Sequence, residues 1–295
     1  MKILVTGATG YVGGAVCDAL KAAGHQVVGL ARNQERAHLL ESRGFVSRIG
    51  DLDDLPGLSA AAADSEAVIH AAMKFGAGAG ARDSTAVAAM LDALAGSGKP
   101  FVYSSGVWVT GDTGGRMVGE AAMLKPPPLV AWRPTVEEMV CAAKERGVKS
   151  VVLRPGMVHG RKGGALAGLF QSAREHGAVR IIGNGENHWS TVHIDDLADL
   201  YVRAVTSPAP GELFIACGGM PQTTGKIARA VAEACGIEGK VELIPVETAR
   251  QQLGPLADCL AMDLKAGSTK AARFFGWTVR KPSIFDEIFS GSYLS

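Results

Sequence analysis

The stretch Thr6-Gly7-Ala8-Thr9-Gly10-Tyr11-Val12-Gly13 decides the fold, because it joins a short apolar run at 2–6 to an amphipathic run. The first run has the length of a buried strand, and the second has helical spacing. Gly7 lets the chain turn sharply, Gly10 lets the backbone approach a pyrophosphate, and Gly13 lets the helix pack close to the strand. The free amides at the start of such a helix attract phosphate groups. The stretch therefore predicts a dinucleotide-binding turn.

Strand-like and helix-like segments alternate through the first half of the chain. The expected strands are 2–6, 25–31, 46–50, 67–72, 100–104 and 150–154, and the expected helices are 11–23, 34–42, 82–94 and 136–145. Nearly continuous apolar strands between helices are typical of a parallel sheet that is covered on both faces. The pattern predicts an α/β fold built on a doubly wound parallel sheet of the Rossmann type.

After Pro155 the alternation loosens, and the expected helices 166–175 and 195–205 mix with turn signals such as Gly183-Asn184-Gly185. We expect residues 1–155 to form a dinucleotide-binding domain whose sheet is completed by about 192–217. Residues 156–295 are expected to form a smaller, C-terminal substrate-binding lobe.

Composition excludes several classes of protein. Thirty basic and 29 acidic side chains among 295 residues leave a formal charge of +1, which gives no field for nucleic acid or an anionic membrane. No apolar run reaches the roughly 18–20 residues that span a bilayer. The five cysteines form neither a CxxC motif nor a Cys/His cluster. We therefore expect a cytoplasmic protein with no metal site.

The end of the second expected strand indicates which dinucleotide is bound. Arg32 stands where an acidic residue would bind the ribose 2′-hydroxyl and repel a 2′-phosphate, and Arg36 follows one helical turn later. A guanidinium makes charge-assisted, bidentate contacts to a phosphate. This position therefore predicts NADP(H) as the cofactor.

Six motifs in order resemble the extended short-chain dehydrogenase/reductase superfamily, over nearly the whole chain. They are TGATGYVG at 6–13, GDL at 50–52, VIHAA at 68–72, RPGMVHG at 154–160, VHIDDLA at 192–198 and GW at 276–277. The resemblance implies a small-molecule substrate, a monomeric or homodimeric state, and a cofactor site along the carboxyl ends of the strands. Its candidate residues are Gly7, Thr9, Gly10, Tyr11, Val12, Gly13, Arg32, Asp51, Leu52, Ala71, Ala72, Met73, Ser104, Arg133, Pro155 and Val158.

The catalytic residues depart from the pattern of this superfamily. Its members carry a serine or threonine after the fifth strand, and Ser105 matches this position best, although a shift by one residue places Gly106 there. They also carry a YxxxK motif, but this chain has no tyrosine between Gly106 and Leu153. Aligning Glu137 with the acidic residue that follows the motif puts Arg133 at the lysine and Leu129 at the tyrosine.

A substitute for the missing tyrosine must therefore be sought elsewhere. Arg133 can hold the ribose hydroxyls through its planar fork, but a leucine donates no proton. His159 stands at the usual tyrosine of RPxxVYG, in a loop that borders the nicotinamide in the superfamily, and an ordinary histidine pKa suits a general acid. The candidate catalytic residues are Ser105, Arg133 and His159, and a loop histidine with a purely local hydrogen bond is the alternative for His159.

These features lead to three functional hypotheses. The first is an NADPH-dependent reductase of a small or medium-sized organic substrate, activated or conjugated so that hydride transfer proceeds without the usual tyrosine. The second is an epimerase, dehydratase or isomerase that retains its dinucleotide, which Arg32 disfavours because such enzymes generally prefer NAD. The third is a non-catalytic protein that senses a dinucleotide. NADPH consumption separates the first from the third, and a cofactor that never exchanges supports the second.

Overall fold

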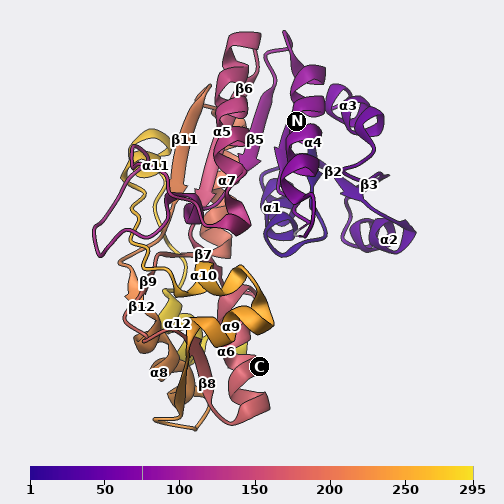
Figure 1. Ribbon diagram of the computed structural model, residues 1–295. Coiled ribbons are helices and arrows are strands. Elements are labelled where there is room, and N and C mark those ends of the chain that lie inside the picture. The colour runs from indigo at the N-terminus through magenta and orange to yellow at the C-terminus, as the bar shows by residue number, and fades with distance from the viewer. Residues whose placement is uncertain (75, 295) are drawn as a thin grey trace. The chain divides into compact units, whose positions relative to one another are not determined.

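The computed structural model describes residues 1–74 and 76–294, which divide into two compact units (Figure 1). The first unit comprises 1–105, 132–154 and 198–214, and the second comprises 106–131, 155–197 and 215–295.

A seven-stranded sheet is the centre of the first unit. Its order is β11-β6-β5-β4-β1-β2-β3. The strands are β1 (Lys2–Thr6), β2 (Gln26–Ala31), β3 (Val46–Ile49), β4 (Ala67–His70), β5 (Pro100–Ser104), β6 (Lys149–Pro155) and β11 (Glu212–Ala216). The pairs from β3 through β6 are parallel. The chain adds strands on one side of β1 up to β3 and then resumes at β4 on the other side. This confirms the doubly wound sheet and places its reversal point between β1 and β4, where such sheets bind ligands.

Helices cover the sheet because both of its faces are apolar. They are α1 (Tyr11–Ala22), α2 (Gln34–Ser42), α3 (Leu55–Ala63), α4 (Ala79–Leu94), α5 (Arg133–Ala142) and α7 (Ile194–Thr206). Leu4 and Val68 pack into a core with Leu58 of α3 and Met90 of α4. Their sequence neighbours Ile3 and Ile69 point to the opposite face and are equally buried.

One helix of this unit, α3, is not among the helices expected from the sequence. Its composition is almost uniformly small and apolar, so it lacks the polar face that marks an amphipathic helix. Its start does carry a signal, because the Asp54 side chain accepts a hydrogen bond from Gly57 N and Pro56 lies in the first turn. Both are typical of helix N-termini.

The second unit combines short strand pairs with helices. The strands are β7 (Met157–His159), β8 (Val179–Ile182), β9 (His188–Trp189), β10 (Thr191–His193), β12 (Gln222–Thr223) and β13 (Val241–Ile244). β7 pairs with β10 and β8 with β13 in parallel, while β9 and β12 are antiparallel. The helices are α6 (Gly164–His176), α8 (Thr224–Ala234), α9 (Val246–Leu253), α10 (Leu256–Ala261), α11 (Thr269–Phe275) and α12 (Ile284–Ser290). Phe170, Ile227 and Ile288 are central to its core.

One transition between the units falls between Arg154 and Pro155, next to the expected boundary, but two segments lie on the other side of it. Residues 106–131 group with the second unit, and 198–214, which contain most of α7, group with the first. In the segment 106–131, Gly115 and Val118 hydrogen-bond to 263–265, and Glu120 accepts from Ile215 N. These contacts join residues far apart in the sequence, so no local pattern reveals them.

Candidate active site

The turn after β1 has the geometry that its glycines predict. Gly7 has φ +72°, and a Cβ there would lie 2.7 Å from the Ala71 carbonyl oxygen. A Cβ on Gly13 would lie 2.2 Å from the Gly7 oxygen. A Cβ on Gly10 would meet only the Gly7 oxygen, at 3.1 Å. The protein itself therefore requires glycine at positions 7 and 13, whereas a Cβ at position 10 would make one tight contact and needs a smaller adjustment.

A buried hydrogen-bond network fixes the ends of β1 and β4 below this turn. Ala72 N donates to Thr6 Oγ1 at 3.3 Å, and Thr6 Oγ1 lies 2.7 Å from His70 Nδ1. His70 Nε2 lies 2.9 Å from Asp83 Oδ1, and the Tyr103 hydroxyl donates to Asp83 Oδ2 at 2.7 Å. A neutral His70 protonated at Nε2 satisfies every member, because Thr6 then donates to Nδ1. The network ties the two strands at the reversal point to α4.

The remaining cofactor candidates of the first unit also lie at carboxyl ends of strands. Arg32 follows β2 and is exposed, and Asn33 beside it caps α2 by accepting from Arg36 N at 3.0 Å. Asp51 and Leu52 follow β3, where both are half-buried. The residues Ala71, Ala72 and Met73 follow β4 and are also half-buried. Pro155 and Val158 belong to the second unit, in the segment that contains β7.

Two of the three candidate catalytic residues belong to the first unit, around the end of β5. Ser105 N donates to Leu153 O at 2.8 Å, and its buried Oγ has no hydrogen-bond partner among the described residues. Arg133 begins α5, and its Nη1 donates to Ser104 O at 2.6 Å. Its guanidinium lies 4.9 Å from the centroid of the Trp132 ring. This edge of the sheet thus presents a cation and an unsatisfied hydroxyl.

The alignment that placed Arg133 at the lysine rests on Glu137, and Glu137 has a defined partner. Arg154 at the end of β6 donates to both Glu137 carboxylate oxygens, and both side chains are almost fully buried. Such a buried pair strongly resists loss of either member, because a lone charge would remain without water. The pair fixes the rotation of α5 and so directs Arg133 toward the end of β5.

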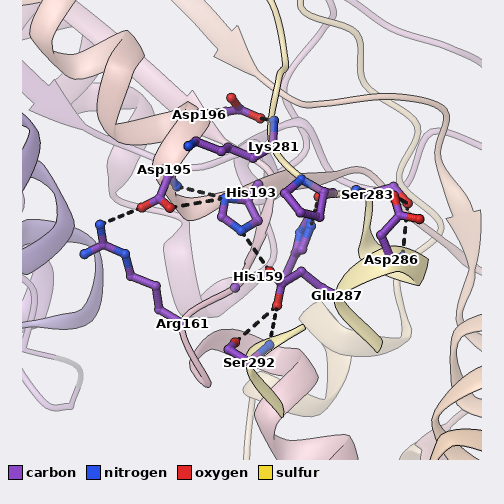
Figure 2. Close-up of polar contacts among 12 residues, drawn as sticks. His159, Arg161, His193, Asp195, Asp196, Lys281, Ser283, Asp286, Glu287 and Ser292 are labelled. Carbon is purple, nitrogen blue, oxygen red and sulfur yellow. Dashed lines mark hydrogen bonds and ion pairs between the residues drawn. The ribbon is translucent and has the colours of Figure 1, made fainter. Parts of the chain in front are cut away.

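His159, the third candidate, lies in a polar cluster of the second unit (Figure 2). Its ring meets the His193 ring edge to face, with centroids 5.4 Å apart, and it is only 3% exposed. Its Nε2 lies 3.4 Å from Pro282 O, whereas its Nδ1 has no partner among the described residues. Burial, helped by the nearby His193, lowers the pKa of His159 to about 4. His159 is therefore neutral at pH 7, which does not favour it as an imidazolium acid.

The other residues of this cluster hold distant segments of the second unit together through hydrogen bonds. Asp195 N donates to His193 Nδ1 at 3.1 Å, so the proton of His193 lies on Nε2, which is 3.2 Å from Glu287 Oε1 of α12. The Asp196 carboxylate accepts from the backbone of Arg280 and Lys281, as Figure 2 shows for Lys281. Trp277 Nε1 donates to Asp196 O at 2.9 Å, and this hydrogen bond joins the VHIDDLA and GW motifs.

Another histidine of this unit, His188, is paired with an aspartate. Its Nδ1 and backbone N both approach Asp263 Oδ1, at 2.8 and 2.7 Å, and Gly115 N donates to Oδ2 at 2.8 Å. Burial would raise the pKa of Asp263, but the hydrogen bonds from His188 and Gly115 hold it below its usual value. The carboxylate therefore joins three segments of the second unit.

A doubly wound sheet with a glycine turn at its reversal point defines a dinucleotide-binding protein of the α/β class. The comparison with protein families is more specific: the chain belongs to the NAD dependent epimerase/dehydratase family, whose model matches residues 3–216. Membership makes a nicotinamide dinucleotide the cofactor class. The residues present fit this group, because the glycine turn leads from the carboxyl end of β1 into the start of α1 and the Ser105 hydroxyl lacks a partner among the described residues.

Individual relatives agree with this family. The chain is 30% identical to the uncharacterized protein YLL056C of Saccharomyces cerevisiae, covering 98% of both chains. It is 33% identical to the 2-alkyl-3-oxoalkanoate reductase of Stenotrophomonas maltophilia, covering 74% of this chain and 68% of the relative. Among solved structures, the dTDP-glucose 4,6-dehydratase of Bacillus anthracis in complex with NAD superposes with a TM-score of 0.83 at 14% identity, over 99% of this chain and 95% of the other. At that identity the likeness establishes the fold alone.

The part of the chain that the structure describes contains no helix long and apolar enough to cross a membrane.

Proposed function

We propose that this protein is an NADPH-dependent reductase that acts on an activated or conjugated carbonyl of a small or medium-sized organic molecule. The observation that carries this proposal is Arg32 at the end of β2. Its side chain is exposed and has no ion pair or hydrogen bond within the described chain. It follows the strand directly, and no acidic residue accompanies it until Glu35. This arrangement favours a 2′-phosphate, and NADPH is the hydride donor of many reductases.

Two relatives support reduction of an activated carbonyl. The relative from Stenotrophomonas maltophilia is named as a reductase of 2-alkyl-3-oxoalkanoates. Another, from Stigmatella aurantiaca, is named as a ketoreductase of a 3-oxo-dihydroquinoline oxide and is 27% identical over 85% of this chain. In a 3-oxo acid the second carbonyl group withdraws electrons from the reacting one. Such a substrate depends less on a strong general acid than an ordinary ketone does.

The residues at the end of β5 would then have separate roles in the reduction. When bound, the reduced dinucleotide supplies the hydride. Arg133 would hold the ribose with the guanidinium nitrogens that Ser104 O does not occupy, and the Ser105 hydroxyl would donate a hydrogen bond toward the reacting oxygen. His159 remains a candidate only as a neutral N–H donor, because its pKa of about 4 leaves no imidazolium at pH 7.

The test is NADPH consumption by the purified protein with ethyl acetoacetate and with menadione, a 3-oxo ester and a quinone. We expect turnover with at least one of them, and NADPH to be preferred over NADH. Ser105→Ala and Arg133→Met should each lower kcat at least tenfold. Absence of NADPH consumption with both probes contradicts the reductase proposal.

A second candidate has an observation of its own. A UDP-glucose 4-epimerase of Mycolicibacterium smegmatis is 26% identical over 94% of this chain. An epimerase returns the hydride to its substrate and therefore retains its cofactor. A nicotinamide dinucleotide that co-purifies and does not exchange with added NADPH would favour this candidate.

A further inference from the structure

Ser104, the last residue of β5, is held at two of its atoms. Arg133 Nη1 donates to its carbonyl oxygen at 2.6 Å, and the Tyr201 hydroxyl lies 2.6 Å from its Oγ. Tyr201 belongs to α7, and its side chain is fully buried, whereas Ser104 is half-buried at the edge of the sheet where ligands bind. All three residues belong to the first unit.

The direction of the hydrogen bond between the two hydroxyls follows from burial. Tyr201 has no other polar partner among the described residues. If Ser104 were the donor, the phenolic proton would be buried without an acceptor, which costs about 1–3 kcal/mol. Tyr201 therefore donates to Ser104 Oγ. The hydroxyl proton of Ser104 then points away from Tyr201 and remains available to another acceptor.

Three effects act on the acidity of Tyr201, and the one that opposes a phenolate is the largest. Burial raises the pKa of Tyr201 to about 12, while the hydrogen bond with Ser104 and the positive charge of Arg133 act in the opposite direction. The phenol is thus protonated at neutral pH, yet it is still a stronger acid than an aliphatic alcohol. A phenolate formed there would be stabilised by the Arg133 charge.

We propose that Tyr201 and Ser104 form a proton relay that replaces the missing tyrosine, with Ser104 as the group that touches the substrate. While the substrate carbonyl is reduced, the Ser104 O–H bond breaks and the proton passes to the substrate oxygen. The Tyr201 proton moves to Ser104 Oγ at the same time, so the negative charge ends on the Tyr201 oxygen. Hydride and proton together convert C=O to CH–OH. After the product leaves, water returns a proton to Tyr201 through Ser104.

This relay rests on the reductase function proposed above. It adds a requirement for Tyr201 and Ser104, which that proposal does not make. Tyr201 is a positioning and relay residue with no contact to the substrate. Ser105, in contrast, has no side chain behind it to resupply a proton, because its Oγ lacks a partner among the described residues. The two serines are therefore separable by mutation.

The experiment compares Tyr201→Phe, Ser104→Ala and the double variant with the parent in NADPH consumption with ethyl acetoacetate and menadione. We expect each single variant to lower kcat about 10²-fold, and the double variant to lose no more than either single variant, because the two groups act as one unit. The dissociation constant of NADPH should stay within about twofold. Activity measured across mixtures of light and heavy water should indicate two protons in flight for the parent and one for Tyr201→Phe.

Tyr103→Phe is the matched control, because it removes an equally buried phenolic hydroxyl that donates to Asp83 rather than to Ser104. Urea unfolding of all variants measures the stability that each hydroxyl contributes. We expect the control to lose stability and to lower kcat far less than Tyr201→Phe does. Normal kcat in Tyr201→Phe, or an equal loss in Tyr103→Phe, overturns the relay while the reductase function stands. A parent that consumes no NADPH with either probe overturns both.

Discussion

The ends of β1 and β5 show two different kinds of constraint. At the end of β1, Gly7 and Gly13 are required by backbone geometry, because a Cβ at either position would lie within 2.7 Å of a backbone oxygen. For the side chains expected around the end of β5, the alignment through Glu137 predicts a departure from the family pattern, with Leu129 and Arg133 at the tyrosine and lysine of YxxxK. A turn in which backbone packs against backbone tolerates few substitutions. A reaction that depends on a few side chains can change while the fold stays the same.

The largest effect is expected at Gly10, which should matter for the ligand far more than for the fold. Gly10→Val places a branched side chain at the start of α1, where the pyrophosphate would approach. We expect NADPH affinity to fall at least about 10³-fold, equivalent to about 4 kcal/mol, with circular dichroism unchanged. Calorimetric titration measures the affinity. Binding equal to that of the parent would place the phosphates elsewhere.

Gly13 is expected to show the reverse behaviour. A Cβ at this position would lie 2.2 Å from the Gly7 oxygen, so the turn must shift to accept it. We expect Gly13→Ala to lower the free energy of unfolding by about 3 kcal/mol in urea titration. Gly14→Ala is the control in the same helix, because its Cβ would meet the flexible Arg43 side chain at 3.4 Å. If both variants were equally stable, backbone geometry would not explain the third glycine.

A pH titration of stability tests whether His159 is neutral. Its pKa of about 4 lies below the ordinary value of 6.5, so the unfolded chain binds more protons between these two values. Its contribution is therefore complete above pH 6.5 and lost as the pH falls toward 4, by up to about 3 kcal/mol. His159→Phe should remove this part of the slope, and replacing the exposed His176 by Gln should not. An unchanged slope in His159→Phe would show that folding does not lower the pKa of His159. His159 would then again be a candidate imidazolium acid.

The smallest effect is expected at Arg32, where the contact is exposed. Arg32→Asp should weaken NADPH binding by one to two decades, about 1.5–3 kcal/mol, and leave NADH binding equal or tighter. Titration of both cofactors into both proteins measures the reversal. Equal preference in parent and variant would show that Arg32 does not contact the 2′-phosphate.

Much of the first unit could be predicted from local patterns. The strands are apolar runs of the right length, and Gly7 and Gly13 fulfil the predicted structural roles. The failure at α3 has a local cause as well, since a helix of small apolar residues has no periodic contrast. The alignment of Arg133 through Glu137 stays a prediction, and it rests on the fixed spacing of residues within one helix.

Only the tertiary structure brought Tyr201 to Ser104, 97 residues away, and Trp277 to Asp196, 81 residues away. The sequence indicates that the segment of α7 is helical. Packing against the sheet decides which of its side chains reaches the end of β5. Burial of His159, and with it the loss of its charge at neutral pH, has the same origin. Strands, turns and helices follow from interactions among neighbours in the chain, whereas the surroundings of a titratable group are set by residues that folding brings to it.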